Sequence, residues 1–234
     1  MNLQALKLGK LVLVLGGARS GKSRFAQDLA AELGGDDVLF LATAEASDDE
    51  MTRRIEHHRQ SRSASWQTIE QPLDVGAALA AIGNLPRVIL LDCLTLLVTN
   101  IVLQDDSDSS QAEQRMRTEI EAILSVIDQA DITTIIVSGE VGMGLVPETS
   151  LGRRFRDLLG WSNQFFASHA AATYFMLAGR AINATAIAST VHQVAPCRFR
   201  GIRSGDSRER RNHERWFSVY RRNQIQSQPK AFQK

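Results

Sequence analysis

The chain has 234 residues, 44% of them hydrophobic, and a formal net charge of +1 at pH 7. This length and hydrophobic content suffice for one large α/β domain, or for a domain with an appendage, and predict a globular protein. No apolar run approaches the roughly 20 residues that span a bilayer, and the first ten residues lack the features of a secretion signal, so we expect a cytoplasmic protein without a membrane span.

Five apolar runs without alternation predict buried parallel strands, because a strand that is covered on both faces needs no polar side. These runs are Leu11–Leu15, Val38–Ala42, Val88–Leu91, Ile132–Val137 and Thr173–Ala178. Helical patterns lie between them at Lys22–Leu33, Asp48–Arg59, Ala112–Gln129 and Ser150–His169, with Ser150 as the expected N-cap of the last helix. Strands that alternate with helices predict an α/β fold with a mostly parallel sheet flanked by helices.

Charge is distributed unevenly along the chain. Residues 191–234 carry 11 Lys and Arg against three acids, a net charge of +8, which leaves 16 basic and 23 acidic residues, or −7, for residues 1–190. We therefore predict a folded domain at 1–190 and a basic, disordered tail at 191–234. An altered reading frame is one alternative for the tail. Contact with nucleic acid or a membrane surface through counterion release is another, but the tail has no recognisable nucleic-acid motif.

The clearest motif, Gly16-Gly17-Ala18-Arg19-Ser20-Gly21-Lys22-Ser23, follows the first apolar run and leads into the first predicted helix. It satisfies the P-loop pattern G-x-x-x-x-G-K-[ST], whose backbone N–H groups surround phosphate oxygens. Lys22 is expected to neutralise the β- and γ-phosphates, and the Ser23 hydroxyl is expected to ligate Mg²⁺. Asp92, which closes a neighbouring apolar strand, is the candidate for the second metal-side carboxylate; the alternative is an Asp that caps the next helix.

A second polar segment, between Leu39 and Glu70, contains His57 and His58 on a predicted helix. Adjacent helical residues point about 100° apart, so the pair is a poor joint metal site, and at most one of them faces a nucleotide. A histidine on a charged helix can equally be a solvated surface residue. The two cysteines, Cys93 and Cys197, have neither metal-ligand spacing nor a disulfide framework, and we assign them no redox role.

Several stretches resemble, in order and spacing, the bifunctional adenosylcobinamide kinase / adenosylcobinamide-phosphate guanylyltransferase family of cobalamin biosynthesis. They are GGARSGKSRFAQ, LATAEASDDEMTRRIEHHRQSR, the stretch from Trp66 to Glu70, LLDCLTLLVTN, EVGMGLVPE and RRFRDLLGWSNQ. The resemblance implies a RecA-like P-loop fold, usually as a homotrimer. It also implies an enzyme that phosphorylates adenosylcobinamide and then transfers GMP from GTP to adenosylcobinamide phosphate, giving adenosylcobinamide-GDP.

The resemblance also implies which residues form the site. His57, the first histidine of the pair, is implied to carry GMP as a covalent intermediate. The implied nucleotide contacts are Gly16–Ser23, Ala42, Thr43, Ala44, His58, Arg59, Gln60, Ser61, Glu70 and Asp92. The implied cofactors are GTP, ATP and Mg²⁺, with the metal at Ser23 and Asp92.

Elementary chemistry agrees with this assignment. A largely neutral imidazole can attack an α-phosphate at pH 7 with pyrophosphate leaving, and the phosphoramidate that results stays reactive. The kinase step needs no covalent residue, because it depends on positioning and on cations such as Arg19, Arg59 and Arg62. Glu70 could accept hydrogen bonds from the N1–H and N2–H₂ edge of guanine.

The stretch Glu140–Glu148 is expected to leave the carboxyl edge of the sheet, where α/β proteins bind ligands. It is either a glycine-flexed loop near the corrinoid or simply a tight connection. The sequence departs from the family pattern at Gly139, where the family has Asn, and at AGRAINATAIAST, which leads into the basic tail. Two further hypotheses stay open: a kinase-only enzyme in which His57 is structural, and a RecA-like ATPase that acts on nucleic acid with the tail as its anchor.

Overall fold

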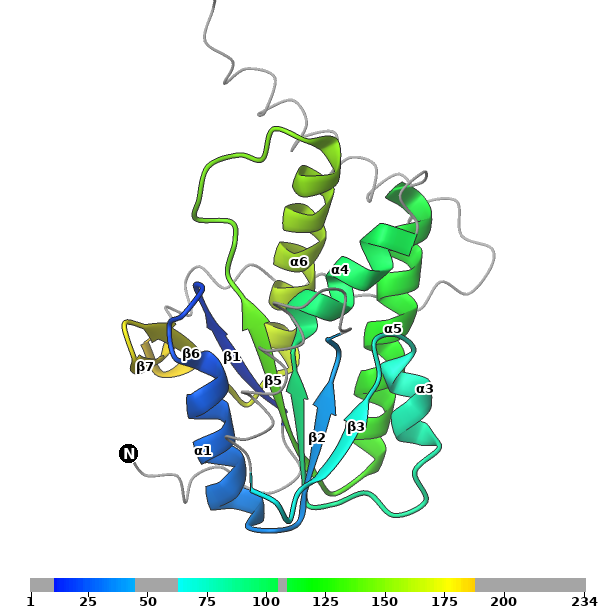
Figure 1. The fold of residues 1–234 in the computed structure, drawn as a ribbon, viewed down its shortest axis with the longest axis vertical. Helices are drawn as coiled ribbons and strands as arrows, with labels where there is room; N and C mark the ends of the chain where they lie inside the picture. Colours follow the sequence, from blue (N-terminus) through cyan, green and yellow to red (C-terminus); the bar gives the residue numbers. More distant parts are fainter. Residues whose placement is uncertain (1–10, 45–62, 105–108, 188–234) are drawn as a thin grey trace, which may run out of the picture. The chain divides into compact units, whose positions relative to one another are not determined.

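A seven-stranded sheet runs through the computed structural model of the chain (Figure 1). The structure describes residues 11–44, 63–104 and 109–187, all within the unit Met1–Pro196. The strands are β1 (Leu11–Gly16), β2 (Val38–Ala42), β3 (Gln67–Glu70), β4 (Val88–Asp92), β5 (Thr133–Gly139), β6 (Ala172–Leu177) and β7 (Arg180–Asn183). Their order across the sheet is β3-β2-β4-β5-β1-β6-β7. Strands β1 to β6 pair in parallel and β7 pairs antiparallel with β6, so the prediction of a mostly parallel α/β sheet is confirmed.

Helices cover both faces of this sheet (Figure 1). They are α1 (Lys22–Gly34), α3 (Val75–Ala80), α4 (Leu94–Gln104), α5 (Ser109–Gln129), α6 (Ser150–His169) and α7 (Ala184–Ile187). Helix α1 packs on one face, and α3, α4, α5 and α6 pack on the other. None of the helices in these described ranges is long and apolar enough to cross a membrane.

Side chains of the central strands alternate between two hydrophobic cores. In β1, Val12 and Val14 pack on the side of α1, whereas Leu11 and Leu13 pack on the side of α4, α5 and α6. The strand is therefore apolar at every position, as a parallel strand covered on both faces must be. Parallel strands also bring their carboxyl ends to one edge of the sheet, and that edge positions the candidate site.

The predicted elements agree with the structure in position. All five predicted strands are confirmed, with end shifts of at most two residues, and so are three of the four predicted helices. The fourth predicted helix, Asp48–Arg59, lies outside the described residues. Elements β3, α3, α4, β7 and α7 were not assigned residue ranges from the sequence.

The predicted N-cap of α6 was wrong by one residue. Thr149, not Ser150, has the extended backbone of an N-cap, with φ −82° and ψ 148°, and its hydroxyl accepts a hydrogen bond from the Gly152 N–H at 3.1 Å. Ser150 is the first helical residue. Both hydroxyl residues suit the cap, and the spacing of three residues to a free helical N–H selects Thr149.

A two-residue turn joins β6 to β7. Ala178 and Gly179 have φ values of 49° and 79°, the positive pair that tight hairpins with the right-handed strand twist require. Leu177 consequently pairs with Arg180. This hairpin continues the sheet beyond β6 and lies beside β1, which carries the P-loop.

Candidate active site

The P-loop connects β1 to α1 in the way its sequence predicted. Gly16, Arg19 and Gly21 have positive φ values of 152°, 54° and 95°, so the loop turns sharply before α1 begins at Lys22. The Lys22 ammonium donates a hydrogen bond to the Gly17 carbonyl oxygen at 2.7 Å and so lies along the loop. Backbone N–H groups at the start of a helix form a ready site for phosphate.

Two neighbouring strands fix the P-loop from outside. The Gly179 N–H, in the β6–β7 turn, donates to the Ser20 carbonyl oxygen at 3.0 Å, and the Glu140 N–H, after β5, donates to the Gly16 carbonyl oxygen at 3.0 Å. A Cβ atom on Gly16 would lie 2.6 Å from the Met176 carbonyl oxygen, closer than real Cβ atoms come. The loop therefore depends on glycine at position 16 and on the hairpin of β6 and β7.

Ser23 and Asp92 face each other at the mouth of the loop. The Ser23 hydroxyl donates to Asp92 Oδ1 at 3.5 Å, a long bond between residues that are 69 positions apart in the chain. Strand β5 lies between β1 and β4, so Asp92 stands one strand further from the P-loop than the neighbouring position we predicted. Ser23 nevertheless reaches it, because it lies on α1, which packs against β4 as well as β1.

This pair of oxygen ligands fits Mg²⁺. A hydroxyl and a carboxylate are the ligands that Mg²⁺ takes beside substrate phosphates. Among the described residues, no group of three or more His, Cys, Asp or Glu side chains gathers into a metal cluster. A site with two protein oxygens suits an ion that completes its shell with phosphate and water rather than with an all-protein cage.

The other predicted contacts at this edge lie level with Asp92. Ala42, at the end of β2, pairs in register with Asp92 on one side and with Glu70 on the other. Glu70 is exposed, whereas Thr43 is fully buried. The structure thus brings Gly16–Ser23, Ala42–Ala44, Glu70 and Asp92 to one edge of the sheet.

The remaining predicted site residues lie outside the described part of the chain. They are His57, His58, Arg59, Gln60 and Ser61, together with Arg62. Their assignments stay predictions.

Cys93 follows Asp92 but is no nucleophile at neutral pH. Burial, and in second place the negative charge of Asp92, raise the pKa of the Cys93 thiol to about 11. Because the thiolate is the reactive form, a covalent intermediate on this side chain is disfavoured. A covalent step at this edge needs another nucleophile.

A buried polar cluster supports the strand ends beside the P-loop. The Ser138 hydroxyl donates to Asn163 Oδ1 at 2.6 Å, and Asn163 Nδ2 donates to the Gly139 carbonyl oxygen at 3.0 Å. The Gly139 N–H donates to Thr95 Oγ1 at 2.6 Å. Gly139, where a family Asn was expected, thus connects β5 to α4 and α6 through its backbone alone.

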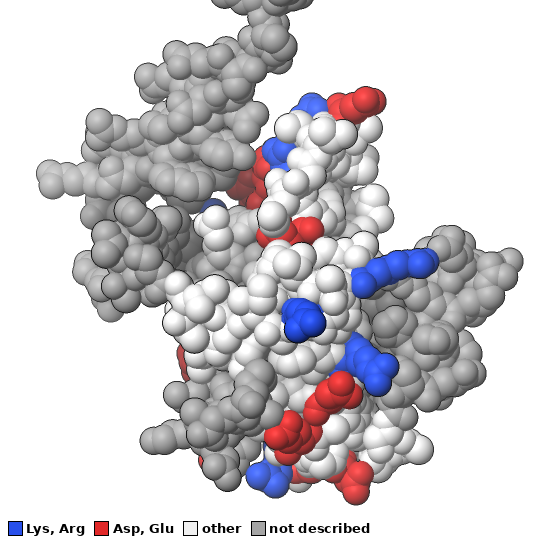
Figure 2. All heavy atoms as spheres, turned by 90° about the vertical axis from the view of Figure 1, so that its left-hand side faces the viewer, with Lys and Arg blue, Asp and Glu red and all other residues white. Residues whose placement is uncertain are grey.

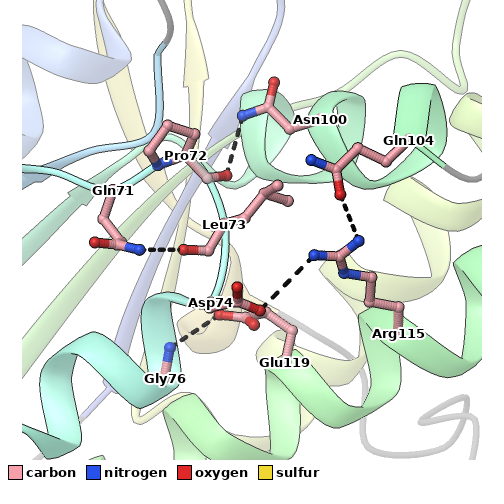
Figure 3. Close-up of polar contacts among 9 residues, drawn as sticks. All are labelled: Gln71, Pro72, Leu73, Asp74, Gly76, Asn100, Gln104, Arg115 and Glu119. Atoms are coloured by element: carbon pink, nitrogen blue, oxygen red, sulfur yellow. Dashed lines mark hydrogen bonds and ion pairs between the residues drawn. The ribbon is translucent and has the colours of Figure 1, made fainter.

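Sequence reasoning missed four of the supporting residues: Thr95, Asn100, Asn163 and Gly179. Asn100 donates to the carbonyl oxygens of Thr43 and Pro72, both at 3.0 Å, and so connects the segments after β2 and β3; Figure 3 shows the bond to Pro72. The available indication was composition, because Thr95, Thr99 and Asn100 are polar residues inside the mostly apolar helix LTLLVTNIVLQ. A buried polar side chain normally has a bonded partner.

Comparison with known proteins gives a family with the same chemistry. The sequence model of the family described as "Cobinamide kinase / cobinamide phosphate guanyltransferase" matches residues 12–184. The chain belongs to this family. Membership makes it a bifunctional kinase and guanylyltransferase that uses nucleoside triphosphates, as the motifs indicated, and favours this interpretation over a nucleic-acid ATPase.

Curated relatives agree along most of their own length. The chain is 46% identical over 167 residues to the bifunctional adenosylcobalamin biosynthesis protein CobP of Pseudomonas aeruginosa, which covers 71% of this chain and 92% of that protein. It is 39% identical over 176 residues to the bifunctional adenosylcobalamin biosynthesis protein CobU of Escherichia coli K12, with 72% and 96% covered. It is 37% identical over 176 residues to the protein of the same name in Salmonella typhimurium, with 72% and 96% covered. Residues 191–234 lie beyond the family match.

Proposed function

We propose that Gly16–Ser23 binds the triphosphate of GTP or ATP, and that this one site serves both the kinase and the guanylyltransferase reaction. The observation that carries the proposal is that Ser23 Oγ lies 3.5 Å from Asp92 Oδ1 directly after the loop. The Lys22 ammonium is bonded to the Gly17 carbonyl oxygen of the same loop. The loop amides and Lys22 would hold the phosphate oxygens, so the reacting phosphorus is oriented before chemistry begins.

Mg²⁺ belongs to this proposal as a cofactor. Ser23 and Asp92 would hold the ion, which would supply charge neutralisation for the triphosphate. Lys22, whose ammonium bonds to the Gly17 carbonyl oxygen, would add positive charge along the loop, and Arg19 is exposed in the loop, where it can approach a phosphate. Phosphoryl transfer to the cobinamide hydroxyl then needs no covalent protein intermediate.

For the guanylyl half, we propose His57 as the nucleophile. Its imidazole nitrogen would attack the α-phosphorus of GTP, a P–N bond would form, and pyrophosphate would leave. An oxygen of cobinamide phosphate would next attack the same phosphorus and break the P–N bond, which returns the free imidazole. The high pKa of Cys93 supports a histidine rather than this cysteine in the role.

Glu70 is proposed to recognise the guanine base. It is exposed at the same edge of the sheet, level with Ala42 and Asp92. A carboxylate accepts two hydrogen bonds from the N1–H and N2–H₂ groups of guanine. Glu70→Gln would lower the preference for GTP over inosine triphosphate, which lacks the N2 amino group. An unchanged preference would remove Glu70 from the base site.

The corrinoid substrate, adenosylcobinamide or its phosphate, is proposed to contact the loop between β5 and α6. Met143 and Leu145 are 82% and 96% exposed in this loop, which starts beside Gly16. Arg153 fixes the far end of the loop by donating to the Pro147 and Glu148 carbonyl oxygens. Exposed apolar side chains on an anchored loop suit a large, partly apolar ligand.

A homo-oligomer, a trimer by resemblance, completes the proposal. Strand β7 ends the sheet in the described part of the chain. Leu177 at the end of β6 and Ile182 on β7 are exposed there. Figure 2 shows the side of the molecule that carries α1 and β7, where charged side chains form small separate groups on a largely uncharged surface. Open strand edges with apolar side chains favour pairing with another chain.

Labelling with α-³²P-GTP tests the two halves separately. We expect protein-bound label that is acid-labile and base-stable, that disappears in His57→Ala and that persists in His58→Ala. Kinase activity with adenosylcobinamide should survive in His57→Ala and be lost in Lys22→Ala. Label that persists in His57→Ala would refute the covalent role of His57, and full kinase activity in Lys22→Ala would refute the P-loop assignment.

A further inference from the structure

Thr43 has a fully buried side chain whose hydroxyl is committed to a single neighbour. It donates to the Cys93 carbonyl oxygen at 2.6 Å and accepts from the Cys93 N–H at 2.9 Å. In addition, the Thr43 N–H donates to the Asp92 carbonyl oxygen at 3.3 Å. Three hydrogen bonds therefore join Thr43, the residue after β2, to Asp92, which ends β4, and to Cys93, which follows it.

Asn100 extends this connection to a third strand. Its amide group, on α4, donates to the carbonyl oxygen of Thr43 and to that of Pro72, each at 3.0 Å; the second bond is drawn in Figure 3. Pro72 follows β3, and the Gln71 N–H in the same segment donates to the Ala42 carbonyl oxygen at 2.8 Å. The segments after β2 and β3 are thus bonded to each other and to α4, the helix that begins directly after Asp92 and Cys93.

We propose that Thr43 is a positioning residue, supported by Asn100, that holds the Asp92 carboxylate opposite Ser23. The inference rests on the proposed metal role of Ser23 and Asp92. It assigns Thr43 no contact with the nucleotide through its hydroxyl, because the side chain is fully buried and its one hydroxyl proton is donated to Cys93.

The physical reason lies in where β4 ends. Asp92 is the last residue of the strand and α4 begins at Leu94, so Cys93 is the single residue between two regular elements. A hydroxyl that satisfies both backbone groups of that residue fixes the direction in which the preceding carboxylate points. Groups that orient a metal ligand in this way typically change metal affinity or activity by 10–100-fold when they are removed.

Thr43→Val provides the decisive substitution, because valine keeps the shape of threonine and loses the hydroxyl. The Cys93 N–H then loses its partner, and the Cys93 carbonyl oxygen keeps only the 3.3 Å bond from the Leu97 N–H, so Asp92 is less restrained opposite Ser23. Thr43→Ser keeps the hydroxyl and should restore the parent behaviour. Thr99→Val is the matched control on α4, since the Thr99 hydroxyl donates to the Thr95 carbonyl oxygen of its own helix and, among the described residues, joins no other segment.

The measurement is Mn²⁺ binding by electron paramagnetic resonance in the presence of GDP, with nucleotide binding in EDTA followed by a fluorescent GDP analogue. We expect Thr43→Val to weaken Mn²⁺ binding by roughly ten-fold and to leave metal-free nucleotide binding within about two-fold, because the P-loop holds the phosphates. Thr43→Ser and Thr99→Val should bind Mn²⁺ as the parent does.

Two results would overturn the inference: parent-like Mn²⁺ binding in Thr43→Val, or equal weakening of metal-free nucleotide binding, which would indicate general damage. If Thr43→Val does not fold, Asn100→Ala replaces it, with the same expectation and the same refutation. Asp92→Asn separates this inference from the proposed function. Loss of Mn²⁺ binding in Asp92→Asn but not in the Thr43 and Asn100 variants refutes the positioning role alone, and no loss in Asp92→Asn refutes the metal site itself.

Discussion

Gly16→Ala tests whether the hairpin of β6 and β7 sets the position of the P-loop. The added Cβ would lie 2.6 Å from the Met176 carbonyl oxygen and 2.8 Å from Ser20 Oγ. Ordinary contact begins at 3.4 Å, so the loop and β6 must separate by about 0.8 Å, the difference between 3.4 and 2.6 Å. Overpacking of this kind costs about 1–3 kcal/mol, and the positive φ of 152° at this position adds strain for a residue with a Cβ.

We therefore expect Gly16→Ala to lower the free energy of unfolding by about 2–4 kcal/mol, measured by urea denaturation. Kinase activity should fall on the order of 100-fold, because a misplacement near 1 Å of the groups that position the reacting phosphate slows catalysis by about that factor. Gly17→Ala is the stability control, since its added Cβ meets nothing within 4 Å. Equal unfolding free energies for both variants and the parent would refute the reasoning.

Three further predictions follow from buried or open positions. Burial raises the pKa of Glu119 above its ordinary 4.5, so the folded protein retains a proton that the unfolded chain has released, and stability falls as the pH rises from about 4.5 through the folded pKa. Glu119→Gln should remove that fall in melting temperature, and an unchanged pH profile would contradict it. Gly160→Ala, in the open middle of α6, should stabilise the protein by about 0.5–1 kcal/mol in urea denaturation, and a loss of stability would show an unseen contact. Cys93 should react with iodoacetamide at pH 9 on the order of 50-fold more slowly than free cysteine, measured by peptide mass spectrometry; equal rates would contradict its raised pKa.

The central strands could be predicted because both of their faces are buried. Val38–Ala42 and Val88–Asp92 are apolar at almost every position, a pattern with few alternatives in an α/β chain. Strand β3 could not be predicted in the same way, since it is four residues long, lies at the sheet edge and has mostly exposed side chains. Helix α3 is also short, at six residues, and a distant residue, Glu119, accepts a hydrogen bond from its Gly76 N–H at 2.9 Å (Figure 3).

The candidate site divides in the same way between local and distant causes. The P-loop is a contiguous motif, and the roles of its glycines, lysine and serine in phosphate and metal binding can be predicted from the sequence alone. By contrast, the hydrogen bond from Asn100 to the Thr43 carbonyl oxygen joins residues 57 positions apart. The bond from the Gly179 N–H to the Ser20 carbonyl oxygen joins residues 159 positions apart. No local pattern encodes such a bond, because it exists only after the strand order is set.

The register of the sheet sets the level of Asp92 relative to the P-loop. Asp92 lies level with Ala42 and with Val137, and Val137 is level with Val14, two residues before Gly16. Strand β1 therefore extends about 7 Å past the level of Asp92 before the P-loop begins, at about 3.3 Å per residue. Along the strand direction, Asp92 consequently lies before the P-loop begins, at the level where Ser23 on α1 can reach its carboxylate.

The strand order adds a direction to this arrangement. From β1 to β3 the order passes through β5, β4 and β2, four spacings of about 4.8 Å, so Glu70 lies about 19 Å across the sheet from the P-loop. A nucleotide whose phosphates are held at Gly16–Ser23 can approach Glu70 only by lying across the carboxyl ends of the intervening strands, above Asp92. The hydrogen bonds from Asn100 to the carbonyl oxygens of Thr43 and Pro72 join the strand ends along that path, between the P-loop and Glu70.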